Sequence, residues 1–232
     1  MVRYAFTMIE LIFALVIMSI VFISLPLVLL NNASSVEDNI IQESIFLTSS
    51  KMSQVLTFQW DNASSEAGMA TVSASDVIDV TAGDGNLSRN TSDFRVGHFQ
   101  QDKHRRMSPI GTPRFATAIG QEGAIFDDID DFDGLINQNI IAATGVGGYK
   151  KSYRADVNVS YINDSNFRNM TNYTSNNIDF TLDTTPVLAG TTNLKMIEVR
   201  IEQNNTTGWD PTLVLRAYVA NIGETDYFKR RY

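Results

Sequence analysis

The chain has 232 residues, a formal net charge of −8 and no cysteine. The absence of cysteine excludes disulfides, thiol nucleophiles and zinc–thiolate sites. The acidic balance opposes binding to nucleic-acid phosphates. We therefore expect no nucleic-acid partner, and we interpret the basic cluster at Lys103, His104, Arg105 and Arg106 as a solvated loop or a contact between subunits.

Sequence motifs typical of enzymes are missing. The two histidines are His98 and His104, and there is neither a phosphate-binding glycine loop followed by lysine nor a Gly-x-Ser-x-Gly elbow. We expect that the protein is not an enzyme.

The N-terminal part is an apolar run from Phe6 to Leu30 in which Glu10 is the only charged residue. As a helix with about 1.5 Å rise per residue, the run is roughly 37 Å long, enough to cross a hydrocarbon core of about 30 Å. It is too long for the core of a cleaved secretory signal. The sequence thus predicts a single membrane-spanning helix that contains one carboxylate.

The flanking charges predict the orientation of this span. Arg3 precedes it, whereas the first charged residues after it are Glu37 and Asp38. Basic residues favour the cytoplasmic side of a membrane. We expect a single-pass membrane protein with a cytoplasmic N-terminus and the bulk of the chain outside the cytoplasm.

The residues Ala5-Phe6-Thr7-Met8-Ile9-Glu10-Leu11 resemble the cleavage and methylation signature of type IV prepilins and type II secretion pseudopilins. The resemblance implies that a prepilin peptidase cuts between Ala5 and Phe6, removes the leader 1–5 and methylates the new amino terminus. It also implies that Glu10 pairs with the N-terminal amine of a neighbouring subunit. The chain departs from the family pattern at Ala5 and Ser19, where glycine is usual, and at Pro26, one position early.

Beyond the membrane, residues 31–62 are typical of an amphipathic helix half. The apolar positions recur at spacings of three, four and five and include Val36, Ile40, Ile41, Ile45, Met52, Val55 and Leu56. Residues 6–30 form the membrane-spanning helix, through which the resemblance implies polymerisation. Together with residues 31–62 they predict one helix from about Phe6 to about Trp60, bent or locally opened at Pro26. Because heptads are not sustained, we favour packing against a head over a coiled coil.

Residues 63–232 have the composition of a β-rich head. Alternating patterns predict strands at 153–161, 194–202 and 212–219, with a weaker one at 178–182 and a subdomain around 84–150. The predicted fold class is α+β and type IV pilin-like, with the long N-terminal helix packed on an antiparallel sheet.

An aspartate run in the head comprises Asp127, Asp128, Asp130, Asp131 and Asp133. Calcium takes six to eight oxygen ligands, which such a run supplies if its backbone loops around the ion. The run does not follow the EF-hand pattern. Two interpretations stay open: a calcium site, which is the only cofactor that the sequence suggests, and a turn in which the aspartates cap backbone groups.

These observations favour a structural subunit, a minor pilin or pseudopilin, of a type IV pilus-like filament. Its partners would be other pilin subunits, the prepilin peptidase and the inner-membrane assembly machinery. Adhesion or twitching pili, DNA-uptake pili and the type II secretion pseudopilus remain open. The alternative is a monomeric, membrane-anchored periplasmic binding protein whose acidic loop holds calcium.

Overall fold

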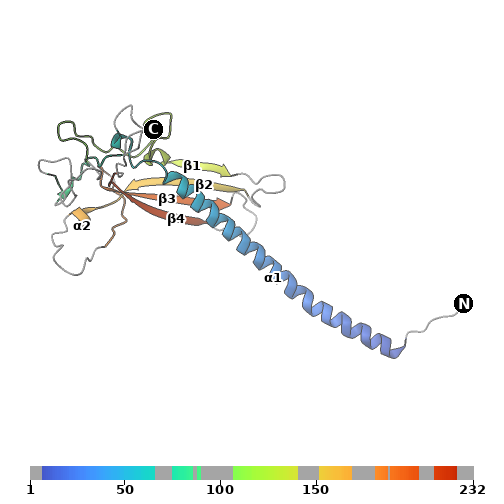
Figure 1. Cartoon of the computed structure of the whole chain (residues 1–232). Coiled ribbons are helices and arrows are strands. Elements are labelled where there is room, and N and C mark those ends of the chain that lie inside the picture. The colour runs from blue at the N-terminus through green and yellow to red at the C-terminus, as the bar shows by residue number, and fades with distance from the viewer. Residues whose placement is uncertain are drawn as a thin grey trace, which may run out of the picture. The chain divides into compact units, whose positions relative to one another are not determined.

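The computed structural model describes residues 7–65, 75–85, 88–89, 107–140, 152–168, 181–187, 189–203 and 212–223. The chain divides into two units, residues 1–46 and residues 47–232. Helix α1, Met8–Val55, begins in the first unit and ends in the second (Figure 1).

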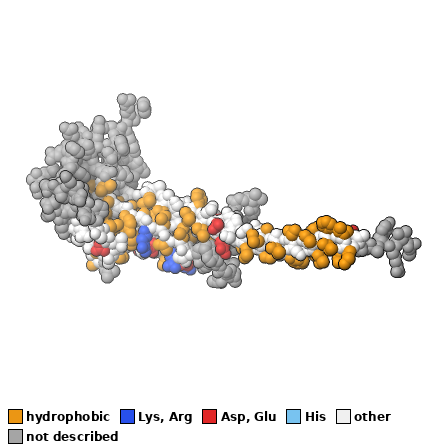
Figure 2. Space-filling model, turned by 90° about the horizontal axis from the view of Figure 1, so that it is seen from below, with side chains coloured by type: hydrophobic (Ala, Val, Ile, Leu, Met, Phe, Trp, Pro, Cys, Tyr) orange, Lys and Arg blue, Asp and Glu red, His pale blue; other side chains and the backbone are white. Residues whose placement is uncertain are grey.

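The first unit contains most of α1. The helix has 48 residues, and its apolar N-terminal part makes it long and apolar enough to cross a membrane. Figure 2 shows apolar side chains along this part of the helix. The helix continues through Pro26 without interruption, and the Ser19 hydroxyl donates to the Leu15 carbonyl at 2.7 Å. A hydroxyl that bonds within its own helix needs no polar partner from the surroundings.

The second unit contains a four-stranded antiparallel sheet in the order β1-β2-β3-β4 (Figure 1). The strands are β1, Leu135–Ile140; β2, Tyr153–Tyr161; β3, Leu194–Gln203; and β4, Leu213–Ala220. A short helix, α2, covers Ser165–Arg168, and 3₁₀ helices form at Asn62–Ser64 and Asp130–Phe132. The three clear strand predictions are confirmed to within one residue, whereas β1 was not predicted.

Several other expectations fall on residues without a described structure. Ala5 and Phe6, the basic cluster 103–106 and both histidines lie outside the described residues, as does much of the 84–150 segment. Of the weaker strand expected at 178–182, residues 178–180 lie outside the described residues. Its last two residues, Thr181 and Leu182, are described and are not in a strand.

The two faces of the sheet differ as the alternating patterns predict. Along β2, Tyr153, Ala155, Val157, Val159 and Tyr161 are buried, whereas the residues between them are at least partly exposed. On the polar face, Arg216 of β4 forms an ion pair at 2.7 Å with its cross-strand neighbour on β3, Glu198. One face is therefore available to the core and the other to solvent.

The core of the second unit includes the last two turns of α1. Leu47, Met52 and Val55 belong to one buried cluster with Ile129, Phe132 and the inner face of the sheet. For residues 47–55, the expectation that the helix packs on the sheet is confirmed. The helix ends at Val55 rather than near Trp60. Trp60 instead joins a second buried cluster with Ile78, Val80 and Tyr161.

Candidate metal centre

The aspartate run folds as a tight turn stabilised by its own side chains. Asp128 Oδ1 accepts hydrogen bonds from the backbone N–H groups of Asp130 and Asp131 at 3.0 and 3.2 Å. Asp131 Oδ2 accepts from the N–H groups of Asp127 and Asp128 at 2.7 and 3.2 Å. Gly134 closes the turn at φ +70°, a conformation that side chains other than glycine rarely adopt. Asp128 and Asp131 thus cap backbone N–H groups, as the second of the two interpretations of the run predicts.

The same turn connects the segment after α1 with the sheet. Asp128 Oδ2 accepts from the Asn62 N–H at 2.6 Å, and the Ile129 N–H donates to the Gln59 carbonyl at 3.0 Å. On the other side, Asp133 Oδ1 accepts from the Val159 N–H of β2 at 2.8 Å. The run therefore links the segment after α1 to strand β2 through hydrogen bonds.

A buried lysine lies against the turn. Lys195 Nζ on β3 is fully buried and lies 3.0 Å from Asp130 Oδ2 and 3.6 Å from Asp61 Oδ2. It donates to the Trp60 carbonyl at 2.7 Å and lies 4.3 Å from the centroid of the Trp60 ring. Two carboxylates, a carbonyl and an aromatic face together replace the water that the ammonium loses on burial.

Among the described residues around the turn, buried carboxylates outnumber the ammonium of Lys195. Asp61, Asp128, Asp130 and Asp131 are all buried. Burial, with the neighbouring Asp130, raises the pKa of Asp128 to about 8. Burial also raises the pKa of Asp130, although Lys195 opposes the shift. A surplus of negative charge in a site shielded from water favours the binding of either protons or a cation.

Three carboxylates converge closely enough to hold one cation. Glu122, Asp128 and Asp131 each place a carboxylate oxygen within 4.8 Å of the others. Asp131 Oδ1 is buried and has no hydrogen-bond partner. A buried acceptor without a partner costs about 1–3 kcal/mol. Glu122 is exposed at the edge of this group, and burial still raises its pKa.

The five aspartates of the run do not act as one ligand set. Asp128 and Asp131 belong to the carboxylate group, whereas Asp130 binds Lys195 and Asp133 binds the Val159 N–H. Asp127 is exposed. Glu122 was not among the residues expected from the sequence. It precedes the run and lies between Gly120 and Gly123.

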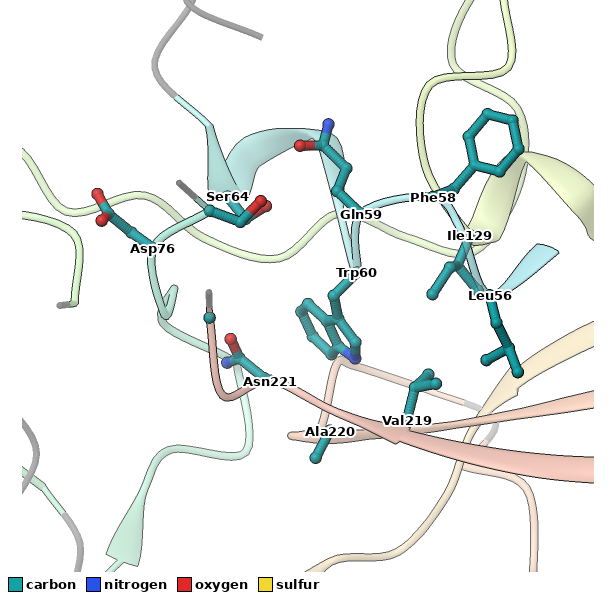
Figure 3. Close-up of a pocket in the computed structure, with 12 residues that line it drawn as sticks. Leu56, Phe58, Gln59, Trp60, Ser64, Asp76, Ile129, Val219, Ala220 and Asn221 are labelled. Carbon is teal, nitrogen blue, oxygen red and sulfur yellow. The ribbon is translucent and has the colours of Figure 1, made fainter. Parts of the chain in front are cut away.

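A separate pocket of about 180 Å³ lies beside the second core cluster (Figure 3). The Trp60 side chain points toward β4, where Val219 and Ala220 line the pocket. Asp76 is the only ionisable group among the described lining residues, and it pairs with Arg114. The described lining residues therefore offer no second ionisable side chain that could act with Asp76 in general acid–base catalysis.

Near the other end of the chain, Glu10 lies in the first turn of α1. Its side chain is exposed, and the described residues supply no ion-pair partner for it. Helix N-termini favour negative side chains, but a screened dipole supplies only about 0.3–1 kcal/mol.

Comparison with models of protein families, with curated proteins and with solved structures finds no match for this chain. A functional assignment therefore depends on the residues themselves.

Proposed function

We propose that the protein is a structural subunit, a minor pilin or pseudopilin, of a type IV pilus-like filament. In this proposal the leader 1–5 is removed by cleavage between Ala5 and Phe6. Before assembly the chain is a single-pass protein of the inner membrane. Helix α1 then packs with the helices of neighbouring subunits. The head is displayed on the periplasmic side before assembly and on the filament surface afterwards.

The observation that carries the proposal is the position of Glu10. A carboxylate in a membrane-spanning helix costs up to about 2.5–3.5 kcal/mol on insertion scales, the value at the helix centre, so Glu10 near the N-terminal end of the apolar run still calls for a function or a partner. Within the described residues Glu10 has no cationic partner. Cleavage before Phe6 would create a positive amine four residues away in each subunit, and an amine of a neighbouring subunit would be that partner.

The arrangement of α1 supports the same proposal. Its apolar part is long enough to span a membrane, and its last turns are built into the core of the head. In an assembled filament the apolar part would pack against other copies, which removes it from lipid without exposing it to water. Residues 47–55, which belong to the core of the head, would attach the head to the assembled helix.

A Glu10→Ala substitution tests the proposal. The variant should enter the membrane as well as the wild type, because it removes a charge, but it should be depleted at least about tenfold from sheared filaments, since an unpaired buried charge remains on the neighbouring amine. Ser24→Ala is the matched control, because Ser24 bonds to the Val21 carbonyl of its own helix at 3.2 Å. Equal incorporation of both variants would defeat the role of Glu10.

The second candidate is the monomeric membrane-anchored binding protein. The carboxylate group of Glu122, Asp128 and Asp131 favours it, since a cation site has no need of a filament. An intact leader on protein recovered from membranes would support this candidate over the filament subunit.

A further inference from the structure

The carboxylates of Glu122, Asp128 and Asp131 have the spacing that one calcium ion requires. Calcium binds oxygen at about 2.3–2.6 Å, so two ligands of one ion are at most about 5.2 Å apart. All three oxygens lie within 4.8 Å of one another. Some point therefore lies within about 2.8 Å of all three oxygens, so small side-chain shifts would bring one ion to calcium–oxygen distances from the three residues.

A second observation points to a ligand. Asp131 is 2% exposed, and its Oδ2 is engaged with the backbone of the turn while its Oδ1 has no hydrogen-bond partner. The carboxylate is thus held in place by one oxygen and leaves the other available. Asp128 is held in a similar way by backbone N–H groups, and each of its oxygens keeps a second lone pair.

We propose that Glu122, Asp128 and Asp131 bind a calcium ion in the head, next to the segment that follows α1. The donors are all hard oxygens, which calcium prefers over softer ligands. Glu122 is exposed, so water can complete the coordination from that side. The site does not depend on the filament proposal.

The ion would have a structural effect. Asp128 also binds the Asn62 N–H at 2.6 Å, so a cation on Asp128 joins the segment after α1 to the loop that carries Glu122. Calcium sites of exported modules have dissociation constants of about 10⁻⁴–10⁻³ M, and we expect this range.

The test uses the full chain in detergent micelles, treated with a chelator and then dialysed. Calcium chloride is titrated by calorimetry, and the unfolding temperature is measured at several calcium concentrations. We expect one ion per chain and a rise in the unfolding temperature that follows saturation. Magnesium chloride, titrated in the same way, should bind more weakly.

Two variants locate the site. Glu122→Gln removes an exposed ligand and should weaken calcium binding at least about tenfold without loss of folding. Asp133→Asn is the control, because Asp133 belongs to the run but binds the Val159 N–H, and it should leave the affinity unchanged within about twofold. The proposal is wrong if calcium at about 5 mM neither binds nor raises the unfolding temperature. It is equally wrong if Asp133→Asn weakens binding as much as Glu122→Gln, or if magnesium binds more tightly than calcium.

Discussion

Lys195 Nζ lies 3.0 Å from Asp130 Oδ2, and neither side chain has any exposed surface. This ion pair joins β3 to the aspartate run, and the Trp60 carbonyl, 2.7 Å from the same nitrogen, adds the segment after α1. Three parts of the head that are distant in sequence therefore meet at one buried ammonium.

Replacement of this lysine should destabilise the head strongly. Lys195→Met leaves Asp61 and Asp130 buried without their cation, and breaking a buried pair from one side costs about 3–5 kcal/mol. The free energy of unfolding in denaturant, measured on the full chain in micelles, checks this. Arg216→Met is the control: its exposed pair with Glu198 should contribute less than about 1 kcal/mol. Similar losses in both variants would contradict the role assigned to Lys195.

Asp133 should act through a single backbone hydrogen bond. Asp133→Ala leaves the Val159 N–H of β2 without its acceptor and should lower the free energy of unfolding by about 1–2 kcal/mol. Asp133→Asn keeps a carbonyl oxygen at the same place and should lower it by less than about 0.5 kcal/mol. If the two variants unfold at the same denaturant midpoint, the hydrogen bond to Val159 does not stabilise the head.

The buried carboxylates should make stability depend on pH when a chelator is present. The pKa of Asp128 is raised by burial from 3.8 to about 8, so the folded protein binds more protons than the unfolded chain between these values. Stability should therefore fall as the pH rises from about 4 to about 8.

Unfolding temperatures at pH 5 and pH 8 check this dependence, with Asp128→Asn as the reference. The variant lacks the titrating carboxyl and should show a smaller difference between the two pH values. An equal or larger difference in the variant would assign the pH dependence to other groups.

The strands that sequence reasoning located share one property. Val157, Val199 and Leu215 lie side by side in the register, each within a strand rich in apolar residues, which alternate with polar ones in β2 and in most of β3. β1 lacks that pattern, because Asn137, Gln138 and Asn139 follow one another in it. Its extended conformation depends on pairing with β2, which local periodicity does not reveal.

The candidate site was only partly predictable for a similar reason. The aspartate run was visible as a cluster, but Asp61, Glu122 and Lys195 join it through tertiary structure. One signal was available in the sequence: Lys195 occupies the same alternating face of β3 as Ile197, Val199 and Ile201. A lysine at an inward position of a strand requires a buried anionic partner.

The central claim is that the chain is processed and assembled as a filament subunit. Mass analysis of the N-terminus of the protein, recovered from its native membranes or filaments, tests it most directly. If the chain is such a subunit, its mature form begins at N-methylated Phe6 and lacks residues 1–5. A chain that still carries Met1 to Ala5 would show that it is not processed as a filament subunit, and Glu10 would then be a carboxylate in a simple membrane anchor.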